Sequence, residues 1–234
     1  MTIGSWHRYV GIAGILSAAT LLAAGFVTAP LPNATGETSN KVATDLISNL
    51  GAARFGVFLL LVGGIPLVLF AAGFTDLLSR GATVARVLGR IAFGCAIATA
   101  ALYAAAQGVG HLATDIAQGS APETVRAVYG VGDEIGFLGN LFLALFVLTT
   151  SVLALVTHAL PTWVRWTGLV GGTCLSLGVL GLSAGFDGLG LLFFIGWFVS
   201  MAWLVVTGFW ILLGKVAAQP QAEYSVAQAG AAAI

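Results

Sequence analysis

The sequence predicts an all-α membrane protein, a polytopic bundle of six transmembrane helices with one additional interfacial helix. Of its 234 residues, 59% are hydrophobic and only 8% are charged, whereas about a quarter of the residues in soluble domains are charged. Such a chain cannot cover itself with a wettable surface, but a bilayer does not require one. Six apolar stretches also reach the length of about 20 residues that a helix needs to cross the hydrocarbon core.

The six predicted spans belong to a single transmembrane domain, residues 1–218. The spans are residues 9–27, 55–74, 88–110, 136–156, 163–182 and 189–213. The first apolar stretch follows Arg8 and resembles a secretory signal, but its length favours an uncleaved first helix. Residues 219–234 are polar and rich in alanine, and we expect them to form a flexible tail.

The longest predicted connection, residues 30–53, contains the interfacial helix in its second half. Val42, Leu46 and Leu50 recur at the spacing of one helical face, and Thr38 or Ser39 precedes them as a candidate N-cap. A helix with one apolar face beside a bilayer is expected to lie along the interface.

Loop charges predict the orientation, because loops rich in lysine and arginine tend to stay in the cytoplasm. Seven of the nine acidic residues fall on the side opposite the two termini. Six of the nine basic residues fall on the side of the termini, namely Arg8, Arg80, Arg86, Arg90, Arg165 and Lys215. The sequence therefore predicts a multi-pass protein of the plasma membrane with both termini in the cytoplasm.

Composition and motifs argue against several classes of function. The net charge is zero, so no basic face is expected to neutralise nucleic-acid phosphates. Haem is disfavoured because His111 lies across the membrane from His7 and His158, and retinal because no lysine lies in mid-helix. No hydrolase or P-loop motif occurs. We therefore assign no catalytic residue and leave the cofactor unknown, with the balance against an enzyme.

Polar side chains gather on the predicted outer side. His111 and Asp115 are four residues apart and share one helix face, while Asp133, Glu134 and Arg54 lie at a similar depth. If these side chains converge, they form an acidic vestibule for a ligand or cation, with His111 and Asp115 as candidate metal ligands. The simpler interpretation is that interfacial charges mark the edge of the lipid, with Arg54 paired to a carboxylate.

Few polar side chains lie within the spans. Asn140, Gln107 and Tyr103 are the clearest, and such groups usually bond to another helix, with ligand contact as the alternative. No charge lies at mid-membrane, which argues against a proton-coupled pump. Trp197, Trp203 and Trp210 recur along the last span, and Trp203 and Trp210, seven residues apart, lie roughly on one face. They could form an aromatic wall around an apolar ligand, although ordinary helix packing is the simpler interpretation.

Glycine motifs predict where helices approach closely, because small residues drive helix association in lipid. Gly168-x-x-x-Gly172 in the fifth span has the expected form. Such a motif predicts either a packing seam inside the monomer or a face for a homo-oligomer or another membrane protein.

Three features occur together in this chain: the polar loop after the first span, the Arg54-Phe55-Gly56 opening of the second span, and the turn from Leu160 to Trp163 followed by Gly168. Together they resemble a family of bacterial six-helix membrane proteins of unknown function. The resemblance extends from Tyr9 to Lys215. It implies the six-helix fold and no particular activity.

Three functions therefore remain open. The chain could bind or pass a small solute or cation, or partner another membrane protein. It could act as an enzyme on a lipid-soluble substrate at the outer His111 and carboxylate cluster. It could also be a structural or assembly subunit without a site.

Overall fold

The computed structural model describes residues 3–32, 34, 36–79 and 83–216. Within these residues it has seven α-helices, one short 3-10 helix and no strand. All the helices except α2 are long and apolar enough to cross a membrane, which confirms the predicted all-α polytopic bundle. The elements in chain order are α1 (Ile3–Thr28), α2 (Ser39–Ser48), α3 (Leu50–Leu78), α4 (Thr83–Ile116), α5 (Pro122–Thr157), α6 (Thr162–Ser183), η1 (Asp187–Leu189) and α7 (Gly190–Leu212).

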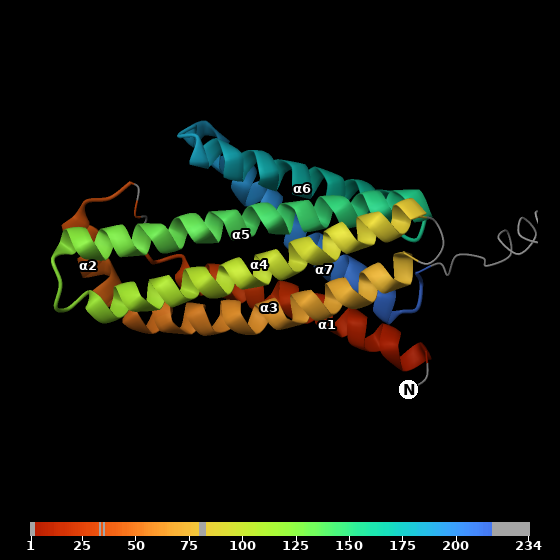
Figure 1. Ribbon diagram of the computed structural model, residues 1–234, viewed down its shortest axis with the longest axis horizontal. Coiled ribbons are helices and arrows are strands. Elements are labelled where there is room, and N and C mark those ends of the chain that lie inside the picture. The colour runs from red at the N-terminus through yellow and green to blue at the C-terminus, as the bar shows by residue number, and fades with distance from the viewer. Residues whose placement is uncertain (1–2, 33, 35, 80–82, 217–234) are drawn as a thin grey trace, which may run out of the picture.

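The six long helices run along the long axis of the molecule (Figure 1). Each packs on the next long helix in chain order, and α7 returns to pack on α1, so the six form a closed ring. The beginning of α1 and the end of α7 lie at one end of this ring, which we call the terminal end (Figure 1). The small helix α2 lies at the other end, which we call the α2 end.

Most of the predicted spans lie within helices that are longer than the span, and the last predicted span nearly coincides with α7. Helices α4 and α5 have 34 and 36 residues, which at 1.5 Å per residue corresponds to about 51 and 54 Å. The hydrocarbon core of a bilayer is only about 30 Å thick. Much of the surplus lies at the α2 end, where α5 begins at Pro122, well before the predicted span at residue 136. These helices therefore extend beyond the hydrocarbon.

Helix α2 is the helix predicted in the first long connection, and its apolar face packs on protein. Thr38 is its N-cap residue, although the Thr38 side chain makes no capping hydrogen bond. Val42 and Leu46 are buried together with Ala117 and Val125 in a small second core. The apolar side of α2 is thus covered mainly by the extension of α5, together with Ile116 and Ala117 at the end of α4, instead of facing lipid.

The polar face of α2 carries a small charge network. The Lys41 ammonium lies 2.6 Å from the Asp45 carboxylate and 3.0 Å from the Glu37 carboxylate. These two partners, Asp45 foremost, raise the pKa of Lys41. The network lies on the exposed side of the helix, where ion pairs add little to stability.

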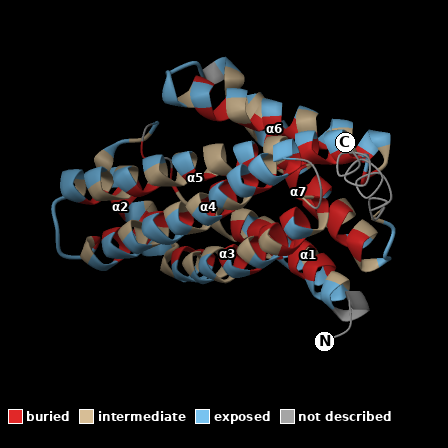
Figure 2. Cartoon of the chain, turned by 45° about the vertical axis from the view of Figure 1, so that its right-hand side comes forward, coloured by how far each residue is buried: buried red, intermediate tan, exposed pale blue. Residues whose placement is uncertain are grey.

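The core is densest towards the terminal end, around the buried side chains of Phe70, Phe74, Phe146 and Trp203. The ring centroids of Phe70 and Phe74 lie 5.3 Å apart, with Phe146 at 6.2 Å from Phe70 and Trp203 at 6.1 Å from Phe74. Figure 2 shows buried residues concentrated on the helices at this end. We call the part of the bundle around these four rings the packed half.

Glycines allow the helices of the packed half to approach closely. A Cβ atom on Gly11 of α1 would lie 2.6 Å from the carbonyl oxygen of Gly208 of α7. The predicted motif of α6 packs in the same way, since a Cβ on Gly172 would lie 3.0 Å from the Ala144 carbonyl oxygen, and one on Gly168 would meet the Trp203 ring. In this structure the Gly168 and Gly172 motif is a seam inside the monomer.

A few predicted features lie outside the described residues. They are Arg80, the proposed tail from residue 219 onward, and the side chain of Asp187.

Candidate functional site

The structure divides the five predicted vestibule residues between two places. Arg54, near the start of α3, lies beside Asp115 of α4, with 3.4 Å between Arg54 Nη2 and Asp115 Oδ1. His111 Nδ1 lies 3.5 Å from the same carboxylate oxygen. All three side chains are exposed. This group therefore lies on the surface of α3 and α4, as the simpler interpretation predicted for Arg54.

Asp133 and Glu134 of α5 have other surroundings. Asp133 is partly buried, and its Oδ2 accepts a hydrogen bond of 3.5 Å from the backbone N–H of Ala34. Glu134 is exposed. Among the residues that the structure describes, no group of three or more His, Cys, Asp or Glu side chains is arranged to hold a metal ion.

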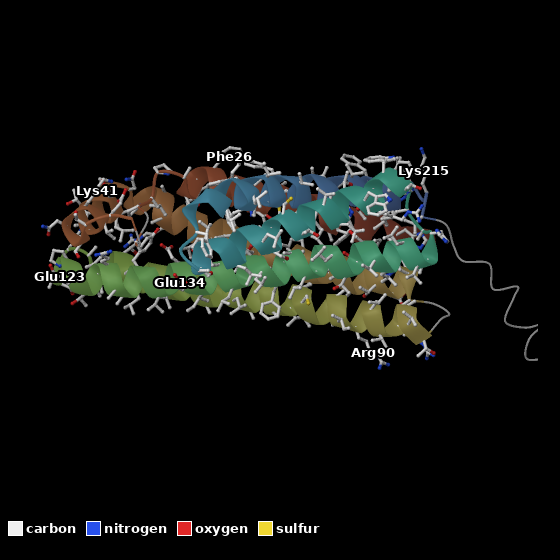
Figure 3. The ribbon with its side chains drawn as sticks, turned by 90° about the horizontal axis from the view of Figure 1, so that it is seen from above. Phe26, Lys41, Arg90, Glu123, Glu134 and Lys215 are labelled. Atoms are coloured by element: carbon white, nitrogen blue, oxygen red, sulfur yellow. The ribbon has the colours of Figure 1, made fainter. Side chains whose placement is uncertain are left out.

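Asp133 instead lines a partly open cavity of about 580 Å³ between the helices. Five of the six long helices line it, and the residues from α6 do not take part. We call the part of the bundle that surrounds this cavity, towards the α2 end, the hollow half. Figure 3 shows Phe26 of α1 at the upper edge of the bundle and Glu134 below it on α5, in this part of the molecule.

One wall of the cavity is polar and is formed by α4 and α5. The Tyr103 hydroxyl donates a hydrogen bond of 2.8 Å to Asn140 Oδ1, and Asn140 Nδ2 donates one of 3.0 Å to the Gly136 carbonyl. The predicted helix-to-helix bond of the buried amide is therefore present. Gln107 and Tyr129 also line this wall, and in the described part of the chain neither side chain has a hydrogen-bond partner.

The opposite wall is aromatic and is formed largely by α1 and α7. Trp197 and Phe198 have ring centroids 5.1 Å apart, and Phe26 lies 6.3 Å from Phe198. Phe137 of α5 contacts Phe193 at 5.7 Å, and Phe194 completes the wall.

This aromatic wall settles how the tryptophans of the last span are used. Trp197 lines the cavity, while Trp203 is packed in the core and donates its indole N–H to the Val164 carbonyl at 3.0 Å. The phenylalanines of the wall were not singled out from the sequence. Their spacing carried a signal, since Phe193 with Trp197 and Phe194 with Phe198 are each four residues apart and therefore share a helix face.

The connection between α1 and α2 covers part of the cavity. Leu31 and Pro32 line it, and the backbone of Ala34 is held at both polar groups, because its N–H faces Asp133 and its carbonyl accepts a hydrogen bond of 2.9 Å from Arg126 Nε. Two side chains of α5 thus fix this connection over the hollow half.

A second, smaller depression of about 350 Å³ lies near the terminal end, between α3 and α4. Arg86 and Arg90 line it together with Thr75 and Ser79. Arg90 is exposed.

The six apolar helices define the class of the chain, a multi-pass integral membrane protein. Comparison with protein-family models, with curated proteins and with solved structures finds no match. The resemblance to bacterial six-helix proteins of unknown function therefore stays a prediction.

Proposed function

We propose that the chain is a membrane-embedded binding protein whose cavity holds a small molecule with an apolar body and a polar group. The observation that carries the proposal is the cavity with two chemically different walls. Aromatic rings such as Trp197 offer an apolar surface on one side, and Asp133, Gln107 and Tyr129 offer polar groups on the other. Ligand sites in proteins commonly combine a mainly apolar lining with a few convergent polar groups.

The packed half favours binding over passage. Between the cavity and the terminal end, the interior of the ring is filled by large buried side chains, including Phe70, Phe146 and Trp203. A solute that entered the cavity would meet these side chains before it reached the terminal end. The cavity also argues against a purely structural subunit, because a bundle without a ligand gains nothing from polar groups that face a partly open cavity.

We further propose that the terminal end faces the cytoplasm of a plasma membrane, so that the cavity faces the outside. The charge distribution supports this orientation, because Arg86, Arg90 and Arg165 belong to the terminal end while Asp133, Glu134 and Glu123 belong to the α2 end. Exposed Trp163 and Trp166 at the start of α6 fit an aromatic belt at the cytoplasmic interface.

The cavity can be filled by substitution at one position. Gly136 lines it, and a Cβ there would have only the Ala106 Cβ nearby, at 3.9 Å. Gly136→Leu therefore introduces a side chain into the free space. The matched control is Gly94→Leu, because Gly94 is exposed on α4 and a Cβ there would have no neighbour within 4 Å.

The test is mass spectrometry of small molecules extracted from the wild type and the two variants, each purified in the same detergent. We expect a compound enriched with the wild type and with Gly94→Leu to fall at least about fivefold with Gly136→Leu, since even a 1 kcal/mol loss changes occupancy about that much. If all three proteins carry the same compounds in the same amounts, the binding function is refuted. The same holds if none exceeds the detergent blank.

A further inference from the structure

The lining of the cavity contains one charged group, and that group is negative. Asp133 is the charged side chain of the lining, and no lysine, arginine or histidine among the described residues joins it there. The only hydrogen bond of the Asp133 carboxylate within the described chain is the long one from the Ala34 N–H. Arg126, on the same helix, donates its Nε–H to the Ala34 carbonyl, is not among the residues that line the cavity, and forms no ion pair with Asp133 within the described chain. An anionic ligand would therefore meet a carboxylate with no basic group to receive it.

A partly buried carboxylate without a cationic partner is costly, because charge leaves water without an opposite charge to replace it. The neighbouring side chain of α5 adds negative charge. Glu134 is the next residue of α5, and no ion pair within the described chain joins either carboxylate to a basic side chain. A positively charged group in the cavity would remove the cost at Asp133, and a neutral ligand would not.

The aromatic wall suits the same kind of ligand. The faces of tryptophan and phenylalanine rings attract cations that lie within about 6 Å of the ring centre, and tryptophan is the best of them. Trp197, Phe198 and Phe26 present such rings to the cavity that Asp133 lines from the other side. A carboxylate and several aromatic rings in the lining of one cavity suit an ammonium group better than a carboxylate or a phosphate.

We infer, building on the proposed binding function, that the occupant of the cavity is a cationic amphiphile, an amine or quaternary ammonium compound with an apolar body. Its positive group lies at Asp133, and its apolar body lies against the rings of α1 and α7. The volume of about 580 Å³ accommodates a drug-sized molecule of this type. Asp133 sets the charge preference, and the aromatic wall sets the preference for an apolar body.

The test uses two probes of the same shape. The first is 4-fluorobenzyltrimethylammonium, whose positive charge does not depend on pH. The second is its carbon isostere, 1-fluoro-4-neopentylbenzene, in which a carbon replaces the charged nitrogen. Fluorine NMR titrations in uncharged maltoside micelles, with empty micelles subtracted, give the dissociation constant of each probe. We expect the wild type to bind the cation at least about tenfold more tightly than the isostere, a modest gain for a partly buried ion pair.

Two variants locate the source of this preference. Asp133→Asn keeps the shape of the side chain, and we expect it to bring the ratio of the two dissociation constants close to one while leaving the affinity for the isostere unchanged. Glu134→Gln removes the same charge from the next, exposed position of α5, and we expect it to leave the ratio within about twofold of the wild type because exposed charges are screened.

The outcomes separate this inference from the function on which it rests. If the wild type binds both probes equally, the cavity binds apolar molecules but the inferred charge preference is wrong. If Asp133→Asn and Glu134→Gln lower the ratio equally, the preference comes from general surface charge, and the inference is also wrong. If neither probe binds beyond the empty micelles, both the inference and the proposed cavity ligand class fail.

Discussion

The packed half and the hollow half of the bundle share five long helices, yet one is filled and the other is open. In the packed half, α1 and α7 meet backbone to backbone at Gly11 and Gly208. In the hollow half, the same two helices are held apart by a large ring, since Gly25 of α1 faces the Trp197 ring of α7. A pair of helices that touch at glycines at one end and at a tryptophan at the other must diverge, and this divergence widens the ring.

The seam between α5 and α6 makes the same point. Gly168 and Gly172 bring α6 onto α5 beside Ser151 and Ala144. Beyond this seam the glycines of α6 face α7 instead, as at Gly178, where a Cβ would meet the backbone of Phe193. Helices α6 and α7 therefore stay together towards their common tip while they separate from α5 (Figure 1). The difference between the halves teaches that the placement of small residues, rather than overall hydrophobicity, decides where this bundle has a cavity.

Two phenylalanines of α5 test most directly whether the two halves differ in packing. Phe146 is fully buried in the packed half, whereas Phe137 lines the cavity. We expect Phe146→Ala to lower the free energy of unfolding by about 3 kcal/mol, because it leaves a void among packed rings. Phe137→Ala enlarges an existing space and loses the contact with Phe193, so it should cost less, about 1 kcal/mol. Denaturation of both variants in the same detergent gives the two values, and equal losses would show that the hollow half is as tightly packed as the other.

A second pair of substitutions tests the role of the glycines, with a smaller expected effect. Gly208→Ala places a Cβ 2.7 Å from the Gly11 carbonyl oxygen, so α1 and α7 must move apart, and we expect a loss of about 1–3 kcal/mol. Gly136→Ala meets no close neighbour, and an alanine in a helix interior is favoured over glycine by roughly 0.5–1 kcal/mol. The melting temperature in detergent should thus fall for Gly208→Ala and stay level or rise for Gly136→Ala. A loss of stability in both variants would contradict the proposed difference between the close α1–α7 contact and the open space at Gly136.

Much of the fold could be predicted because a bilayer imposes strong and local rules. Apolar length located all six spans, and helical periodicity located α2 through Val42 and Leu46. The glycine motif predicted close approach but not its partner, since Gly172 could have met another chain as well as Ala144. The surface that α2 covers was also beyond prediction, because it depends on how far α4 and α5 extend past the hydrocarbon.

The candidate site could be predicted only in part, because it depends on the rotation of each helix. Along α4, Tyr103, Gln107 and Thr114 face the cavity. His111 and Asp115, although only a few residues away, face Arg54 of α3 instead. The sequence indicated the depth of each residue in the membrane, and by depth alone the charged residues of the outer side formed one group. The angular position of a side chain around its helix could not, and it separates Asp115 from Asp133.

This separation leads to the smallest expected effect, at the surface carboxylate outside the cavity. Asp115→Asn weakens the exposed pairs with Arg54 and His111, and exposed pairs contribute little, so the free energy of unfolding should change by less than about 0.5 kcal/mol. Binding of the cationic probe should also stay the same, in contrast to Asp133→Asn. A melting temperature that rises by several degrees with Zn²⁺ or Mn²⁺ in the wild type, and no longer rises in His111→Ala with Asp115→Asn, would instead establish a metal site there. The same result would mean that the surface of the hollow half, and not only its interior, takes part in binding.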